Sequence, residues 1–199
     1  SIWFSQLHVK SCDNNLFDNL RNFSYNLNNF FENKNEINKI SLWAEYFSKC
    51  NNCFLIGKGD NIPIIYEGAL KIKEITYIHA EGYSASSLKH GPLALVSNDF
   101  PIILYISDDE NTAKMVSAYE ELYARGGKIF CISNSLHFIE YMVERPEYDN
   151  NYLILLTFES NIINLIMNIC TQLLAYKISQ NKKINPDKPR NLAKVVTVE

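Results

Sequence analysis

Glu67, Lys71 and Glu74 are the residues of this sequence whose types and spacing best suit acid–base chemistry. At about 100° per residue in a helix, their side chains fall within roughly 60° of one another. A carboxylate in such a group can transfer protons, and a neighbouring lysine can tune its pKa. The alternative is a solvated helix face with a Glu–Lys ion pair, which contributes about a few tenths of a kcal/mol. The opposite face of the same helix carries the residues expected to pack on the core: Ile65, Ala69, Ile72 and Thr76.

Two further residues have chemistry suited to a sugar or carbonyl substrate. His90 precedes Gly91-Pro92, which predicts a turn from which an imidazole can reach a ligand. An exposed or structural histidine is the alternative. Lys194 stands between Ala193 and Val195 near the end of the chain, and an ammonium group in apolar surroundings has a lowered pKa and becomes a nucleophile for carbonyls. A solvated lysine is the alternative there.

Three other patterns are weaker. Residues 57–60 read Gly-Lys-Gly-Asp, which indicates either an anion-binding turn or only a tight strand-to-helix turn, since the third glycine of a dinucleotide fingerprint is missing. Cys50 and Cys53 have redox or zinc spacing without a second pair, so we interpret them as packing cysteines. Three serines could bind phosphate or cap a helix: Ser84, Ser86 and Ser87.

The elements that must position these residues alternate along the chain. The hydrophobic pattern predicts helices over residues 1–30 (one helix or two), 37–47, 62–77, 112–125 and 161–179. It predicts strands over residues 53–56, 101–107, 128–132 and 152–157. Strands alternating with helices predict an α/β fold, a doubly wound three-layer α/β/α sandwich with a mainly parallel sheet.

Composition excludes several classes of protein. The chain has 199 residues, 47% of them hydrophobic, and a formal net charge of -3, so it is neither a disordered protein nor one with a broad basic surface for nucleic acid. Its apolar runs are far shorter than the roughly 20 residues of a membrane helix. An odd count of five cysteines argues for a reducing, cytoplasmic compartment. The start at Ser1, without a secretory signal, predicts a fragment of a longer chain.

Residues 66–83, 88–95 and 189–199, taken together, resemble the glutamine–fructose-6-phosphate aminotransferase (isomerizing) family. The resemblance is to the C-terminal sugar isomerase (SIS) subdomain. It implies a helical lead-in at 1–35, this subdomain at 36–180 and a catalytic tail at 181–199. That family converts fructose 6-phosphate and glutamine to glucosamine 6-phosphate and glutamate in hexosamine synthesis. It also has an N-terminal glutaminase and a first SIS subdomain, which holds most phosphate ligands.

The resemblance also implies a role for each matching residue. Lys194 matches the lysine that forms a Schiff base with the open-chain ketose, which makes the adjacent C–H more acidic. Glu74 matches the carboxylate that moves the proton between C1 and C2. Lys71 matches the lysine that assists at the sugar hydroxyls, and Glu67 supports that network. Ala193 matches a residue of the substrate site, as Lys194 and Glu74 do.

The remaining implied roles concern the assembly. His90 matches the histidine that opens the sugar ring, which in this family comes from the neighbouring subunit, so a homodimer is expected. Ala193 and Val196 match residues that line a dry ammonia path. No metal or other cofactor is needed, because the hydrogen moves between two carbons of one sugar. A non-catalytic sugar-phosphate-binding SIS module and a fructosyl-amine phosphate deglycase are the alternatives, and neither needs the tail.

Overall fold

The computed structural model describes residues 14–145, 151–158 and 162–192 of the chain. Its centre is one sheet in the order β2-β1-β3-β4-β5, in which every neighbouring pair of strands is parallel. The strand order switches direction between β1 and β3, and ligands of doubly wound sheets bind beyond the strand ends at such a point. The strands are β1 (Asn52–Gly57), β2 (His79–Ser84), β3 (Pro101–Ile106), β4 (Lys128–Ser133) and β5 (Tyr152–Ile154).

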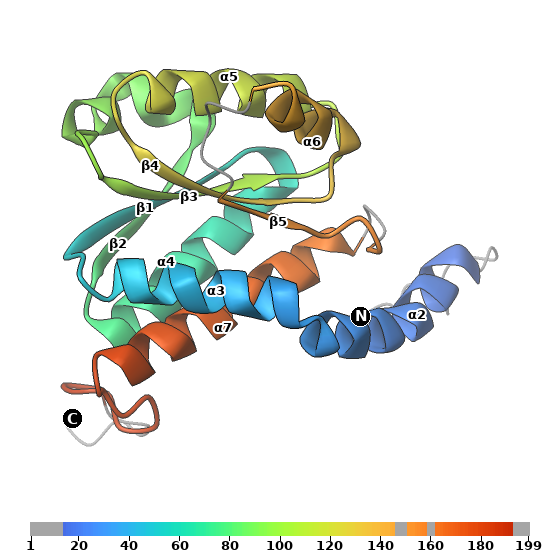
Figure 1. The fold of residues 1–199 in the computed structure, drawn as a ribbon, viewed down its shortest axis with the longest axis horizontal. Helices are drawn as coiled ribbons and strands as arrows, with labels where there is room; N and C mark the ends of the chain where they lie inside the picture. The colour runs from blue at the N-terminus through green and yellow to red at the C-terminus, as the bar shows by residue number, and fades with distance from the viewer. Residues whose placement is uncertain (1–13, 146–150, 159–161, 193–199) are drawn as a thin grey trace, which may run out of the picture.

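Helices cover both faces of this sheet (Figure 1). Helices α3 (Lys34–Phe47), α4 (Ile62–Thr76) and α7 (Ile163–Asn181) lie on one face, and α5 (Thr112–Tyr123) and α6 (Leu136–Val143) lie on the other. Helix α2 (Asn14–Glu32) precedes α3 and reaches away from the sheet. The predicted three-layer α/β/α sandwich with a parallel sheet is confirmed.

The sheet separates two hydrophobic cores because side chains alternate between its faces. In β3, Ile103 and Tyr105 pack with the core under α3, α4 and α7. Ile102, Leu104 and Ile106 pack with the core under α5 and α6. All six residues of β3 are buried, which explains why its sequence is a continuous apolar run rather than an alternating one.

Helix α4 lies very close to the sheet and to α7. A Cβ atom at Gly68 would lie 2.8 Å from Leu55 Cδ2 and 2.9 Å from Thr171 Cγ2, so any larger residue would force these side chains to shift. Beneath it the hydroxyls of Tyr105 and Thr171 form a buried hydrogen bond of 2.5 Å. This packing fixes the face of α4 that points away from the core.

Two elements were missed at the level of sequence, and the bounds of the predicted elements differ from the observed ones by one to three residues at one end or both. Strand β2 is an edge strand that reads His-Ala-Glu-Gly-Tyr-Ser, without the apolar run of the central strands. Helix α6 has only eight residues and begins at Ser135, whose hydroxyl accepts from the N–H of Phe138. Strand β5 ends at Ile154 instead of residue 157, and the helix expected to end near residue 30 continues to Glu32.

Short 3-10 turns lie beyond the carboxyl ends of β1 and β2. They are η1 (Gly59–Asn61), η2 (Ala85–His90) and η3 (Pro92–Leu95). Within the described ranges, no helix combines the length and the apolar character that crossing a membrane requires.

Candidate active site

The Glu67–Lys71–Glu74 stripe forms on α4 as its spacing predicted. Lys71 Nζ lies 2.7 Å from Glu74 Oε2 and 3.7 Å from Glu67 Oε1. The residues expected on the opposite face are all buried: Ile65, Ala69, Ile72 and Thr76. The three charged side chains keep only 31% to 41% of their surface exposed, so one ammonium bridges two partly covered carboxylates.

The charge of Lys71 determines what it can do. The hydrogen bond to Glu74 raises the pKa of Lys71, with a further contribution from Glu67, against a smaller opposing effect of burial. A raised pKa keeps the amine protonated at neutral pH, so Lys71 is a hydrogen-bond donor and not a nucleophile.

The segment that follows α7 contacts the end of α4. The backbone N–H of Arg190 donates to Tyr77 Oη at 2.8 Å, and its guanidinium lies 4.2 Å from the centre of the Tyr77 ring. Tyr77 follows the last turn of α4 in the left-handed conformation, with φ at 62°. That conformation ends the helix three residues after Glu74. The two contacts bring a segment 113 residues away in sequence to the carboxyl end of α4.

His90 lies at the end of η2 and is exposed. Among the described residues of the chain, it forms no hydrogen bond or ion pair with the stripe on α4. The structure thus brings Glu67, Lys71 and Glu74 together and leaves His90 on a separate loop. Lys194, Ala193 and Val196 lie outside the described residues.

The turn after β1 is a tight strand-to-helix connection. A Cβ at Gly57 would lie 2.9 Å from Asn61 Cβ and 3.0 Å from Ile65 Cγ2. Gly59 adopts a positive φ of 59°. Asn61 is buried and donates to Ser107 Oγ at 2.9 Å, which ties the ends of β1 and β3 together. Close packing and backbone conformation are therefore sufficient reasons for both glycines.

The cysteines of the described ranges are packing residues. Cys53, Cys131 and Cys170 are buried, and Cys50 is half-buried, with all four thiols free. Burial raises the pKa of each of these thiols, so none is a reactive thiolate at neutral pH. The interpretation of Cys50 and Cys53 as packing cysteines agrees with this burial.

Sequence reasoning missed two sets of polar residues. The first is the Tyr77–Arg190 contact, for which no local signal exists. The second lies on β2, where Glu81 accepts from the Tyr83 hydroxyl and lies 3.2 Å from His79 Nε2. The hydrogen bond from Tyr83 lowers the pKa of Glu81. Alternation along a strand puts these three on one face, a signal available once β2 is assigned.

Comparison with known proteins finds sequence similarity over most of the chain. Residues 46–140 match the model of the SIS domain. The chain is also related in sequence to proteins named glutamine–fructose-6-phosphate aminotransferase (isomerizing). It is 40% identical to the "probable" enzyme of Acanthamoeba polyphaga mimivirus, over 95% of this chain and 30% of that protein.

Similarity extends to bacterial proteins and to a solved structure. The Escherichia coli O157:H7 enzyme of that name is 43% identical over 81% of this chain and 26% of its own length. The C-terminal domain of glucosamine-fructose-6-phosphate aminotransferase from Francisella tularensis has a TM-score of 0.68 and 37% identity, covering 76% of this chain and 42% of that one. The chain thus spans about 25% to 30% of the length of the curated relatives it matches.

Proposed function

We propose that this chain supplies isomerase chemistry in a glutamine–fructose-6-phosphate aminotransferase, which converts fructose 6-phosphate and glutamine to glucosamine 6-phosphate and glutamate. The identity of 40% over 95% of the chain supports this assignment. The observation that carries it is the anchoring of Arg190 on Tyr77, beside the end of the helix that bears Glu74. Lys194 follows Arg190 by four residues, and four residues of extended chain span at most about 14 Å.

In this proposal Lys194 and Glu74 perform the chemistry on one open-chain sugar. The Lys194 amine adds to the C2 ketone, and loss of water gives an iminium that acidifies the C1–H bond. The Glu74 carboxylate takes the proton from C1 and returns it to C2. Lys71 stays protonated and donates to the sugar hydroxyls, with Glu67 holding it in place. Before this proton transfer, ammonia released from glutamine adds to the C2 iminium and expels the Lys194 amine, so the nitrogen that remains on C2 of the product comes from ammonia.

The proposal includes parts beyond the stripe. His90 opens the sugar ring in the active site of the neighbouring subunit, which makes the enzyme a homodimer; its exposed position on a separate loop supports this role. Ala193 lies in the substrate site, and Ala193 and Val196 line a dry path for ammonia.

The domains and their setting belong to the same proposal. A glutaminase and a first SIS subdomain complete the protein, and residues 1–35, 36–180 and 181–199 are the lead-in, second subdomain and tail. We place the enzyme in the cytoplasm, where free thiols such as those of Cys50 and Cys53 persist, and in hexosamine synthesis.

Borohydride trapping tests the proposal on the intact protein. Reduction with labelled fructose 6-phosphate is expected to attach the sugar to Lys194, and Lys194→Ala is expected to abolish the labelling. Lys188→Ala is the matched control, because Lys188 is an exposed lysine of the same segment with no ion-pair partner among the described residues. Undiminished labelling in Lys194→Ala would refute the Schiff-base role.

A further inference from the structure

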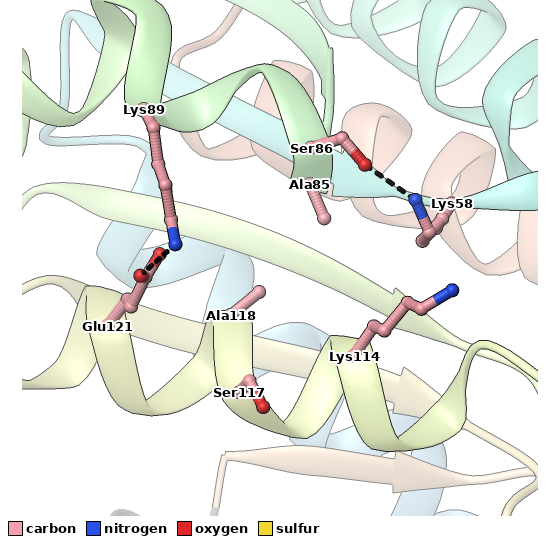
Figure 2. A pocket seen from close by; sticks show the side chains of 8 residues that line it. All are labelled: Lys58, Ala85, Ser86, Lys89, Lys114, Ser117, Ala118 and Glu121. Atoms are coloured by element: carbon pink, nitrogen blue, oxygen red, sulfur yellow. Dashed lines mark hydrogen bonds and ion pairs between the residues drawn. The ribbon is translucent and has the colours of Figure 1, made fainter.

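A pocket lies between η2 and α5, on the face of the sheet opposite α4. It has a volume of about 290 Å³ and opens to solvent. Lys58 from the turn after β1, Ser86 and Lys89 from η2, and Lys114 and Glu121 from α5 project toward it (Figure 2). A pocket near the small end of the usual range of ligand sites suits a compact group rather than an extended ligand.

Positive charge dominates this pocket. Three of its lining residues are lysines and one is an acid. Glu121 Oε1 lies 2.9 Å from Lys89 Nζ and neutralises that lysine. Within the part of the chain that the structure describes, Lys58 and Lys114 form no ion pair. Two ammonium groups from separate elements are thus left uncompensated around one opening (Figure 2).

Of the three acids that shortly precede Lys114 in sequence, two form hydrogen bonds elsewhere, and the exposed Glu110 forms no ion pair within the described residues. Asp108 Oδ1 accepts from Ser135 Oγ at 3.5 Å, and Asp109 Oδ1 accepts from the N–H of Asn111 at 2.6 Å. Asp60 is exposed in η1 and forms no ion pair with Lys58. Like charges held together by a fixed backbone repel one another, and an anion between them relieves that repulsion.

The two serine hydroxyls of the pocket differ in whether they can donate a hydrogen bond to a ligand. Ser86 Oγ accepts a hydrogen bond from Lys58 Nζ at 2.5 Å, which leaves the Ser86 O–H free to donate. Ser117 Oγ donates to the carbonyl oxygen of Ala113 at 3.1 Å and is not available as a donor. The free donors are therefore the Lys58 and Lys114 ammonium groups and the Ser86 hydroxyl.

We propose that this pocket binds a phosphate group, either free phosphate or the phosphate of a small ester, between Lys58, Lys114 and Ser86. Lysine binds phosphate as a point charge, and three converging donors match the oxygens of a tetrahedral dianion. The site is separate from the stripe on α4, because α5 and η2 lie across the sheet from it. The inference therefore stands independently of the isomerase proposal.

Lysine acetylation with mass spectrometry tests the inference in the intact protein, because it reports on each lysine separately. Inorganic phosphate at about ten times its Kd is expected to slow the modification of Lys58 and Lys114 about tenfold. Lys49, an exposed lysine without a described ion pair, serves as the internal control and is expected to be unaffected. Sodium chloride of equal ionic strength is the control for screening.

Substituted proteins and a comparison of different ligands complete the test. Lys114→Gln is expected to remove the protection of Lys58 by phosphate, whereas Lys49→Gln is expected to leave it unchanged. If fructose 6-phosphate protects the two lysines at a lower concentration than inorganic phosphate does, the ligand is a sugar phosphate. If both protect at the same concentration, the ligand is free phosphate. Fructose is expected to protect neither lysine. Equal protection by chloride, or persistent protection in Lys114→Gln, would overturn the inference. Failure of Lys58 and Lys114 to react with the acetylating reagent in the absence of phosphate would also overturn the inference, because a carboxylate of the assembly would then fill the pocket.

Discussion

Removing the Tyr77 side chain is expected to release the start of the tail from α4. Two contacts hold Arg190 there, the 2.8 Å hydrogen bond from its N–H and the 4.2 Å approach of its guanidinium to the ring. Tyr77→Phe removes only the hydrogen bond, and Tyr77→Ala removes both. The left-handed backbone conformation of residue 77 is equally unfavourable for all three side chains, so it does not affect the comparison.

The magnitudes follow from the type and exposure of the two contacts. A net hydrogen bond contributes about 0.5–1.5 kcal/mol, so Tyr77→Phe should lower the docked-to-undocked ratio of Arg190 about 2- to 13-fold. An exposed cation–π contact adds about 0.5–1 kcal/mol, which gives about 5- to 70-fold for Tyr77→Ala. If Lys194 forms the Schiff base, the turnover rate is expected to fall in proportion to the fraction of molecules in which Arg190 is docked on Tyr77.

Amide hydrogen exchange measures the docked fraction directly. The Arg190 amide is expected to exchange faster in Tyr77→Phe and faster again in Tyr77→Ala, by factors in these ranges. Tyr25→Phe is the matched control, because Tyr25 is an exposed tyrosine of α2 and forms no hydrogen bond within the described ranges. Unchanged exchange at Arg190 in Tyr77→Ala would show that the tail is not held by this residue, whatever the role of Lys194.

Three further predictions concern α4. Glu74→Gln is expected to preserve sugar binding and to reduce turnover of the intact enzyme by about 10² or more, as measured by product formation; near-normal turnover would return Glu74 to a surface ion pair. Gly68→Ala is expected to destabilise the protein by about 1–3 kcal/mol in denaturant unfolding, since the added Cβ would overlap Leu55; a stability equal to the parent would contradict the packing described. The raised pKa of Lys71 means that its ion pair with Glu74 is complete below the ordinary lysine pKa of about 10.4 and is lost as pH rises through the higher folded value. The alkaline pH at which Lys71 becomes reactive to acylation should therefore fall in Glu74→Gln, and an unchanged profile of Lys71 in that variant would be inconsistent with this coupling.

Local patterns predicted much of the fold because their causes are local. The apolar runs of β1, β3 and β4 are recognisable because strands buried on both faces exclude charge. The spacing of Glu67, Lys71 and Glu74 predicted one stripe because helical geometry alone brings residues three and four apart together. Strand β2 was not predicted, because an edge strand is partly exposed and its sequence lacks a continuous apolar run.

The composition of the site depends on contacts that no local pattern encodes. Tyr77 meets Arg190 because α4 and α7 pack together on one face of the sheet, so the chain leaving α7 returns to the end of α4. The phosphate pocket likewise joins a turn, a 3-10 segment and a helix that are distant in sequence.

The sequence by itself therefore determined the layers, the acid–base stripe and the likeness to a sugar-converting family. Only the tertiary structure decided which distant side chains share a surface, because that depends on how close the packed layers approach and where left-handed residues turn the chain. Tyr77 illustrates the difference: its place at the end of a helix is a local property, and its partner is a property of the whole fold.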